Sequence, residues 1–90
     1  MKIDLNLDDE SENAEFLENY GTGKGRWLAN RLGLTGKGSS DAATALSNYA
    51  WNKRTAIFCR RSGDIDGALK YERICDLIYS EDIQGKIECW

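Results

Sequence analysis

Residues 41–79 read DAATALSNYAWNKRTAIFCRRSGDIDGALKYERICDLIY, and this stretch decides the fold. Its first half, 41–61, carries apolar residues at helical spacing before the short sequence SGD interrupts the pattern. Gly63 suits the left-handed residue that follows a helix, and Asp64 suits the N-cap of the next helix. A link this short predicts an antiparallel hairpin of two helices, 41–61 and 65–79.

The helix 41–61 has apolar residues on two sides. The side predicted to face the core holds Ala45, Tyr49, Trp51, Thr55, Ala56, Phe58 and Cys59. The other side carries a basic stripe, Lys53, Arg54, Arg60 and Arg61, and between these bases lie Leu46, Ala50 and Ile57. A helix that is apolar on both sides packs on two surfaces. We therefore expect Leu46, Ala50 and Ile57 to be exposed and to form a homo-oligomer interface, most simply in a two-fold dimer.

The remaining segments are shorter. Apolar residues alternate with polar ones over 2–7, which predicts an extended segment that pairs with 86–90, pairs with another copy, or lies on helices. Short helices are expected at 9–20 and 26–32, and proline is absent throughout. Together these features predict one all-α domain, residues 1–90: a long antiparallel helical hairpin braced by two short helices, with a short extended N-terminal segment.

Charge is sorted into three blocks along the chain. Residues 1–20 carry seven acids and one base, residues 21–63 carry eight bases and one acid, and residues 64–90 carry seven acids and three bases. The total of −3 therefore conceals a basic middle. Charge asymmetry of this kind concerns partners more than fold, and it indicates that the chain meets something anionic.

Two loops repeat the sequence Gly-Lys-Gly, at 23–25 and at 36–38, each just before an expected helix. Free backbone N–H groups beside a lysine suit an anion, although plain connectors have the same composition. The predicted anion-binding residues are those of the loops and the stripe: Lys24, Arg26, Lys37, Lys53, Arg54, Arg60 and Arg61. The alternative is that the stripe is solvated, or is covered by helix 65–79 or by the acidic N-terminal helix, through acids such as Glu12, Glu15 and Glu18.

Catalysis has little support in the composition. The chain has no histidine, which removes the commonest general base, and its three cysteines lack the spacing of metal ligands. We expect no catalytic residue, no cofactor and no metal, with Cys59 and Cys75 as reduced core residues. Because no apolar stretch is long enough for a membrane span and the N-terminus is acidic, a cytoplasmic protein is expected.

The stretch 28–35, LANRLGLT, resembles the first helix and turn of a helix-turn-helix DNA reader. Gly36 and Gly38 stand where that family begins its recognition helix, so the resemblance departs from the pattern there. A DNA-binding regulator is therefore the alternative function.

A second resemblance covers residues 24–82. The segment 48–56, NYAWNKRTA, together with Gly63 and with residues 68–69, 71–72 and 74–76, is similar to small helical proteins encoded by bacteriophages. The resemblance implies an accessory role in infection, such as inhibition of a host defence, and assigns no chemistry. Combined with the basic middle, it suggests a non-enzymatic protein that engages an anionic partner. That partner would be a host protein, a nucleic-acid-containing complex or a nucleotide ligand.

Overall fold

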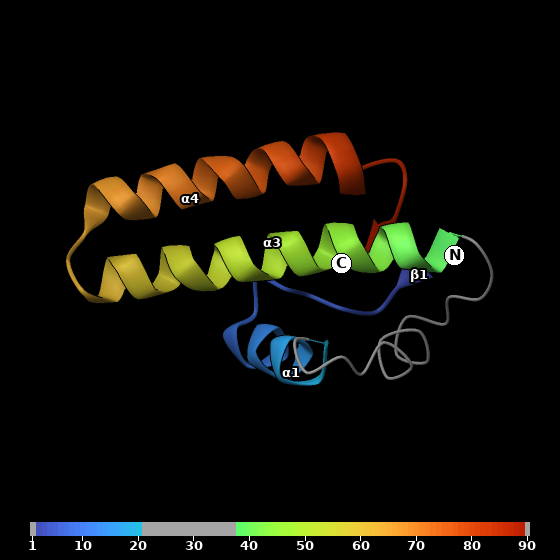
Figure 1. Ribbon diagram of the computed structural model, residues 1–90, viewed down its shortest axis with the longest axis horizontal. Helices are drawn as coiled ribbons and strands as arrows, with labels where there is room; N and C mark the ends of the chain where they lie inside the picture. The colour runs from blue at the N-terminus through green and yellow to red at the C-terminus, as the bar shows by residue number, and fades with distance from the viewer. Residues whose placement is uncertain (1, 21–37, 90) are drawn as a thin grey trace.

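The computed structural model describes residues 2–20 and 38–89, and most of this part of the chain is helical (Figure 1). The elements are β1 (Lys2–Ile3), α1 (Glu10–Tyr20), α3 (Gly38–Arg61), α4 (Ile65–Ile78), the π-helical turn η1 (Tyr79–Ile83) and β2 (Glu88–Cys89). The expected all-α class is confirmed. The helix expected at 26–32 and both Gly-Lys-Gly loops fall largely or wholly outside the described residues.

A tight turn joins α3 to α4. The N–H of Asp64 donates to the carbonyl of Cys59 at 2.9 Å and the N–H of Gly63 donates to the carbonyl of Arg60 at 3.2 Å, which is the Schellman pattern. Gly63 has φ +84°, as a residue ending a helix in this way requires. The side chain of Asp64 then accepts the N–H of Gly67 at 3.0 Å and caps α4. Both predicted roles, helix stop and N-cap, are confirmed.

Helices α3 and α4 lie side by side along their lengths (Figure 1). Small buried side chains, Ala56, Cys59, Ala68 and Cys75, line this contact and allow the helices to approach closely. Cys59 and Cys75 are free thiols, as expected, and burial raises the pKa of the Cys75 thiol to about 11.

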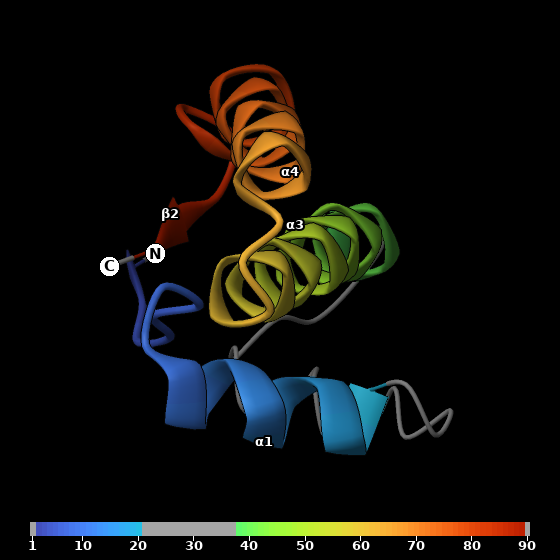
Figure 2. The same ribbon diagram turned by 90° about the vertical axis from the view of Figure 1, so that its left-hand side faces the viewer.

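The opposite side of α3 is covered by the N-terminal part of the same chain (Figure 2). Leu5, Leu7, Phe16 and Leu17 are buried in one cluster with Leu46 and Ala50. Both Leu46 and Ala50 are 0% exposed, so the prediction that they are exposed and form an oligomer interface is wrong. The second surface on which α3 packs is the chain's own N-terminal segment and α1.

The C-terminal end of α4 continues into η1, which places the fully buried Ile83 in the core. Beyond it, β2 pairs in parallel with β1, with Lys2 opposite Glu88 and Ile3 opposite Cys89. Of the three predicted partners for the N-terminal segment, the structure therefore uses two, the C-terminal residues and the helices. None of the described helices has the length and apolar character needed to cross a bilayer.

Candidate binding groove between α1 and α3

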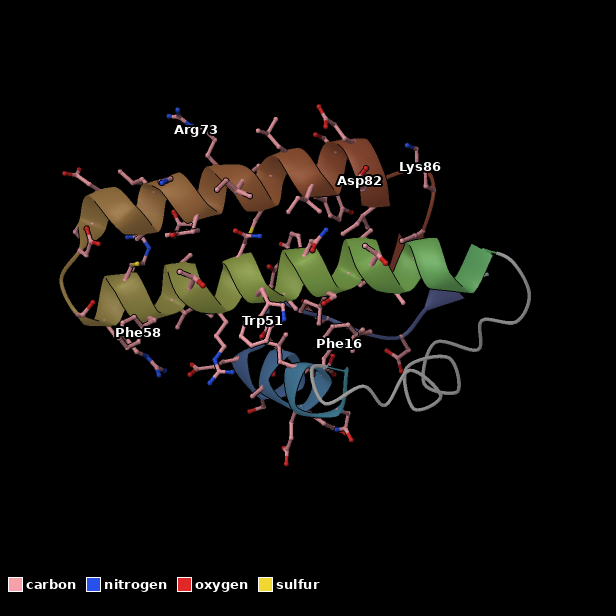
Figure 3. The ribbon with its side chains drawn as sticks, viewed as in Figure 1. Phe16, Trp51, Phe58, Arg73, Asp82 and Lys86 are labelled. Atoms are coloured by element: carbon pink, nitrogen blue, oxygen red, sulfur yellow. The ribbon has the colours of Figure 1, made fainter. Side chains whose placement is uncertain are left out.

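One exposed strip of α3 alternates aromatic rings and guanidinium groups. Trp51, Arg54, Phe58 and Arg61 follow one another at intervals of three, four and three residues, so they lie on one helix face. Trp51 is 48% exposed and Phe58 is 71% exposed, and both lie on the side of α3 that faces α1 (Figure 3). We call these four residues the Trp–Arg strip.

The prediction that Trp51 and Phe58 belong to the core is wrong. Helix α1 crosses α3 steeply rather than running along it, as Figures 1 and 2 show together. A crossing helix covers a short stretch of its neighbour, here the part around Leu46 and Ala50. The last turns of α3 extend beyond it and leave their aromatic side chains in solvent.

A groove of about 250 Å³ lies where α1 and α3 meet. Residues of both helices line it: Glu10, Asn13, Ala14, Arg54, Ile57, Phe58 and Arg61. Two predicted anion-binding residues and one predicted interface residue, Ile57, therefore share a single site. The sequence does not predict that the acid Glu10 and the amide Asn13, both on α1, belong to it.

Asn13 fixes α1 in place on α3. Its side chain is 2% exposed, and its Nδ2 donates to the carbonyls of Leu7 at 3.1 Å and Ala50 at 3.2 Å. At the start of α1, the carboxylate of Asp9 accepts the N–H of Glu12 at 3.0 Å, which caps the helix. The wall of the groove formed by α1 is thus held by hydrogen bonds to backbone groups.

Three of the four bases in the predicted stripe pair with the chain's own acids. Lys53 Nζ lies 3.1 Å from Asp8 Oδ1. Arg60 donates two hydrogen bonds to Glu72, at 2.6 and 2.8 Å, and these lower the pKa of Glu72 and raise that of Arg60. Arg61 donates to Glu10 at 2.5 Å across the groove. The charge blocks of the sequence therefore meet partly inside the molecule, although through acids other than Glu12, Glu15 and Glu18.

Arg54 is the exception. No carboxylate within residues 2–20 and 38–89 pairs with it, and its guanidinium lies 5.9 Å from the centre of the Trp51 ring. An exposed arginine against an indole keeps its positive charge available to a partner. Of the remaining predicted anion-binding residues, Lys24, Arg26 and Lys37 lie outside the described part of the chain.

Asp8 also connects the N-terminal segment to Tyr49. The Tyr49 hydroxyl donates to Asp8 Oδ1 at 2.7 Å, and the same oxygen accepts the ammonium of Lys53. Burial, and then the bond to Asp8, raise the pKa of Tyr49 well above its ordinary value of 10.0. This phenol is therefore held neutral in the folded state.

Replacing Tyr49 by phenylalanine is expected to lower the free energy of unfolding by about 1–2 kcal/mol at pH 7, because a hydrogen bond to a carboxylate is lost. Since the folded-state pKa is raised, the linked stability is complete below about pH 10 and is lost as the pH rises above it. The variant should lack that alkaline loss. Urea denaturation at pH 7 and above pH 10 tests both effects, with Tyr71→Phe on α4 as control. Equal alkaline losses in Tyr49→Phe and the unmodified protein would contradict the assignment.

A second hollow, of about 420 Å³, lies beside the first turns of α3, and Asp82 and Lys86 form part of its wall (Figure 3). Its walls hold none of the predicted site residues, and its two charges have opposite signs. Within the described residues, no three histidine, cysteine or acidic side chains gather as metal ligands would. The groove between α1 and α3 is thus the better candidate site.

The DNA-reading alternative would use the first turns of α3 as its recognition helix. Side chains of Ala42, Ala45, Leu46 and Ser47 in these turns are buried, whereas a recognition helix presents its first turns to the bases. The resembling stretch 28–35 itself lies outside the described residues.

No family model, no curated protein and no solved structure matches the chain. The functional argument therefore rests on the Trp–Arg strip and the groove beside it.

Proposed function

We propose that the chain is a non-enzymatic binding protein that engages an anionic partner through the Trp–Arg strip and the groove between α1 and α3. The observation that carries this proposal is Arg54, which has no carboxylate partner within the described residues and lies against an exposed indole. In this proposal the hairpin is a rigid support for the strip, braced by α1 and by the short helix expected at 26–32.

The composition of the strip supports binding. Exposed tryptophan, phenylalanine and arginine are enriched where proteins meet their partners, because they combine large apolar area with directed hydrogen bonds. Phe58, at 71% exposed, has no role in the core of the chain. Catalysis is not proposed, because the sequence lacks histidine and the groove holds a single carboxylate.

The ion pair between Arg61 and Glu10 is compatible with exchange. Both side chains are exposed, and exposed ion pairs contribute about 0–1 kcal/mol. A partner carboxylate or phosphate that binds Arg61 therefore displaces Glu10 at small cost. Arg54 and Arg61 together would then present two charges to the partner.

The biological setting is part of the same proposal. The resemblance to phage-encoded helical proteins favours an accessory protein or inhibitor of a host defence that acts in the cytoplasm of the infected cell. Self-association into a two-fold dimer stays a prediction, and it requires a surface other than Leu46 and Ala50.

The variant Arg54→Glu/Arg61→Glu tests the function. We expect the unmodified protein to bind at least one of two fluorescent probes at low salt, oligo-deoxythymidine or an acidic helical peptide, and the double reversal to weaken binding at least about tenfold. Fluorescence anisotropy measures the affinity. Lys70→Glu/Arg73→Glu on α4 is the control with the same change in net charge; both bases are exposed, Arg73 points away from α3 (Figure 3), and this variant should bind normally.

Both variants should keep the helical circular dichroism of the unmodified protein, since exposed charges contribute little to stability. Failure of the unmodified protein to bind either probe would overturn the proposed function. Equal weakening by Lys70→Glu/Arg73→Glu would also overturn it, because binding would then follow net charge alone.

A further inference from the structure

We infer that the element recognised by the Trp–Arg strip is an acidic amphipathic helix of a partner protein, laid along α3 beside α1. This inference rests on the proposed function and names the kind of partner. Four features of the described residues carry it: the spacing of the strip, its apolar area, the ion pair already made by α1, and the acids that surround the site.

The spacing of the strip matches a helix. Arg54 and Arg61 are seven residues apart, which places them about 10 Å from each other along the axis of α3. Two carboxylates seven residues apart on a partner helix have the same separation, because seven residues make two turns. An apolar residue of the partner between those two acids would meet Phe58, which lies between the arginines. A second apolar residue, beyond the acid that pairs with Arg54, would meet Trp51, as side chains do where helices pack together.

The apolar part of the site suits a side chain more than a solvated ion. Phe58 and Trp51 are exposed, Ile57 is partly buried, and Ala14 of α1 completes an apolar wall of the groove. Aromatic residues contribute most to binding when a partner's apolar side chains exclude water from them. An inorganic anion would leave this area in water, whereas a leucine-bearing helix face would cover it.

The chain already contains one contact of the proposed kind. Helix α1 is acidic, with four glutamates and no base, and it lies across α3 with its Glu10 bonded to Arg61. This pair shows that a glutamate on a helix reaches the guanidinium of the strip. The partner helix would use Arg54 in the same way and compete with Glu10 for Arg61.

The surrounding acids disfavour a nucleic acid. A nucleic-acid strand binds through several lysine or arginine side chains that lie along its path and have no acidic partner in the protein. Here Asp8, Glu72 and Glu10 already pair with Lys53, Arg60 and Arg61. A regularly charged backbone would also pass the acidic side chains of α1, whereas a helix can place its acids at the two arginines alone.

A designed peptide tests the inference. The acidic probe consists of repeats of EAALQQA, which place glutamate and leucine on one face, and the basic probe replaces each glutamate by lysine. We expect the unmodified protein to bind the acidic peptide, and Arg54→Glu/Arg61→Glu to lose at least about tenfold in affinity for it. The double reversal should in turn prefer the basic peptide. Trp51→Ala/Phe58→Ala should weaken both pairings, because it removes the shared apolar contact.

The outcomes separate the inference from the proposed function. Binding of oligo-deoxythymidine through Arg54 and Arg61, without binding of the acidic peptide, overturns the helix inference and keeps the anion-binding function. Binding of neither probe overturns both. Acidic-peptide binding that persists in Arg54→Glu/Arg61→Glu, or a reversal variant that does not prefer the basic peptide, overturns the placement of the helix on the strip.

Discussion

Replacing Leu46 by alanine is expected to lower the free energy of unfolding by about 2–5 kcal/mol, the usual cost of truncating a fully buried leucine. Leu46 is 0% exposed in the cluster that joins α3 to the N-terminal segment and α1. For a domain of this size such a loss is a large part of the roughly 5–15 kcal/mol that holds the fold. Urea denaturation followed by tryptophan fluorescence measures it.

The control is Leu69→Ala, the same truncation at a leucine on α4 that is 52% exposed. It should cost under about 1 kcal/mol, because its side chain is already largely in water. The assignment of Leu46 to the monomer core would fail if the two truncations cost the same. It would also fail if Leu46→Ala changed the oligomeric state in solution and left the free energy of unfolding unaltered.

The change Asn13→Asp should be as damaging, for a different reason. The Asn13 amide donates to two carbonyls, those of Leu7 and Ala50, in a buried position. A carboxylate of the same shape cannot donate and would face both carbonyl oxygens without a compensating charge. We expect a loss of about 3–5 kcal/mol at pH 7, comparable to breaking a buried charge pair.

The destabilisation of this variant should also depend on pH, and it should become smaller as the pH falls. Burial beside carbonyl oxygens raises the folded-state pKa of the new carboxyl, so its penalty is greatest above that pKa. As the pH falls through it, the protonated carboxyl can donate again and part of the stability returns. Denaturation at pH 7 and near pH 4 tests this, with Asn48→Asp on the exposed side of α3 as control. A penalty that grows toward acid would contradict the role of Asn13.

Local signals in the sequence were sufficient for the hairpin turn. Gly63 and Asp64 have chemical roles that depend on neighbouring backbone alone, and both are confirmed. The free, buried state of Cys59 and Cys75 also followed from composition. In each case the deciding contacts are close in the chain or follow from one helix period.

The orientation of α3 could not be predicted in this way. This helix carries apolar residues on two sides, so the periodicity of its sequence does not say which of them α1 will cover. The predictions that Leu46 is exposed and that Phe58 lies in the core are both wrong. The position at which α1 crosses α3 depends on tertiary contacts, such as the hydrogen bond from Asn13 to Ala50. The 3-4-3 spacing of the Trp–Arg strip is the signal in the sequence that groups Trp51 and Phe58 with the arginines.

The same difficulty applies to the ion pairs. Glu10 and Arg61 are 51 positions apart, and their pairing depends on how α1 packs on α3. The acids proposed as alternatives, Glu12, Glu15 and Glu18, belong to the same helix but not to the pairs with the stripe. Charge blocks therefore predicted attraction between the N-terminal segment and α3 without identifying the residues.

The way α1 is attached has a consequence for the energetics of opening. Helix α1 is held by Phe16, Leu17, the Asn13 amide and one exposed ion pair, whereas α4 lies along α3 over the full length of α4. Such a segment can release as a cooperative unit, a partial unfolding below the global transition. Release would remove one wall of the groove, so the proposed site exists only while α1 is docked. A ligand bound between the two helices would consequently slow deuterium uptake by the amides of α1 while leaving those of α4 nearly unaffected.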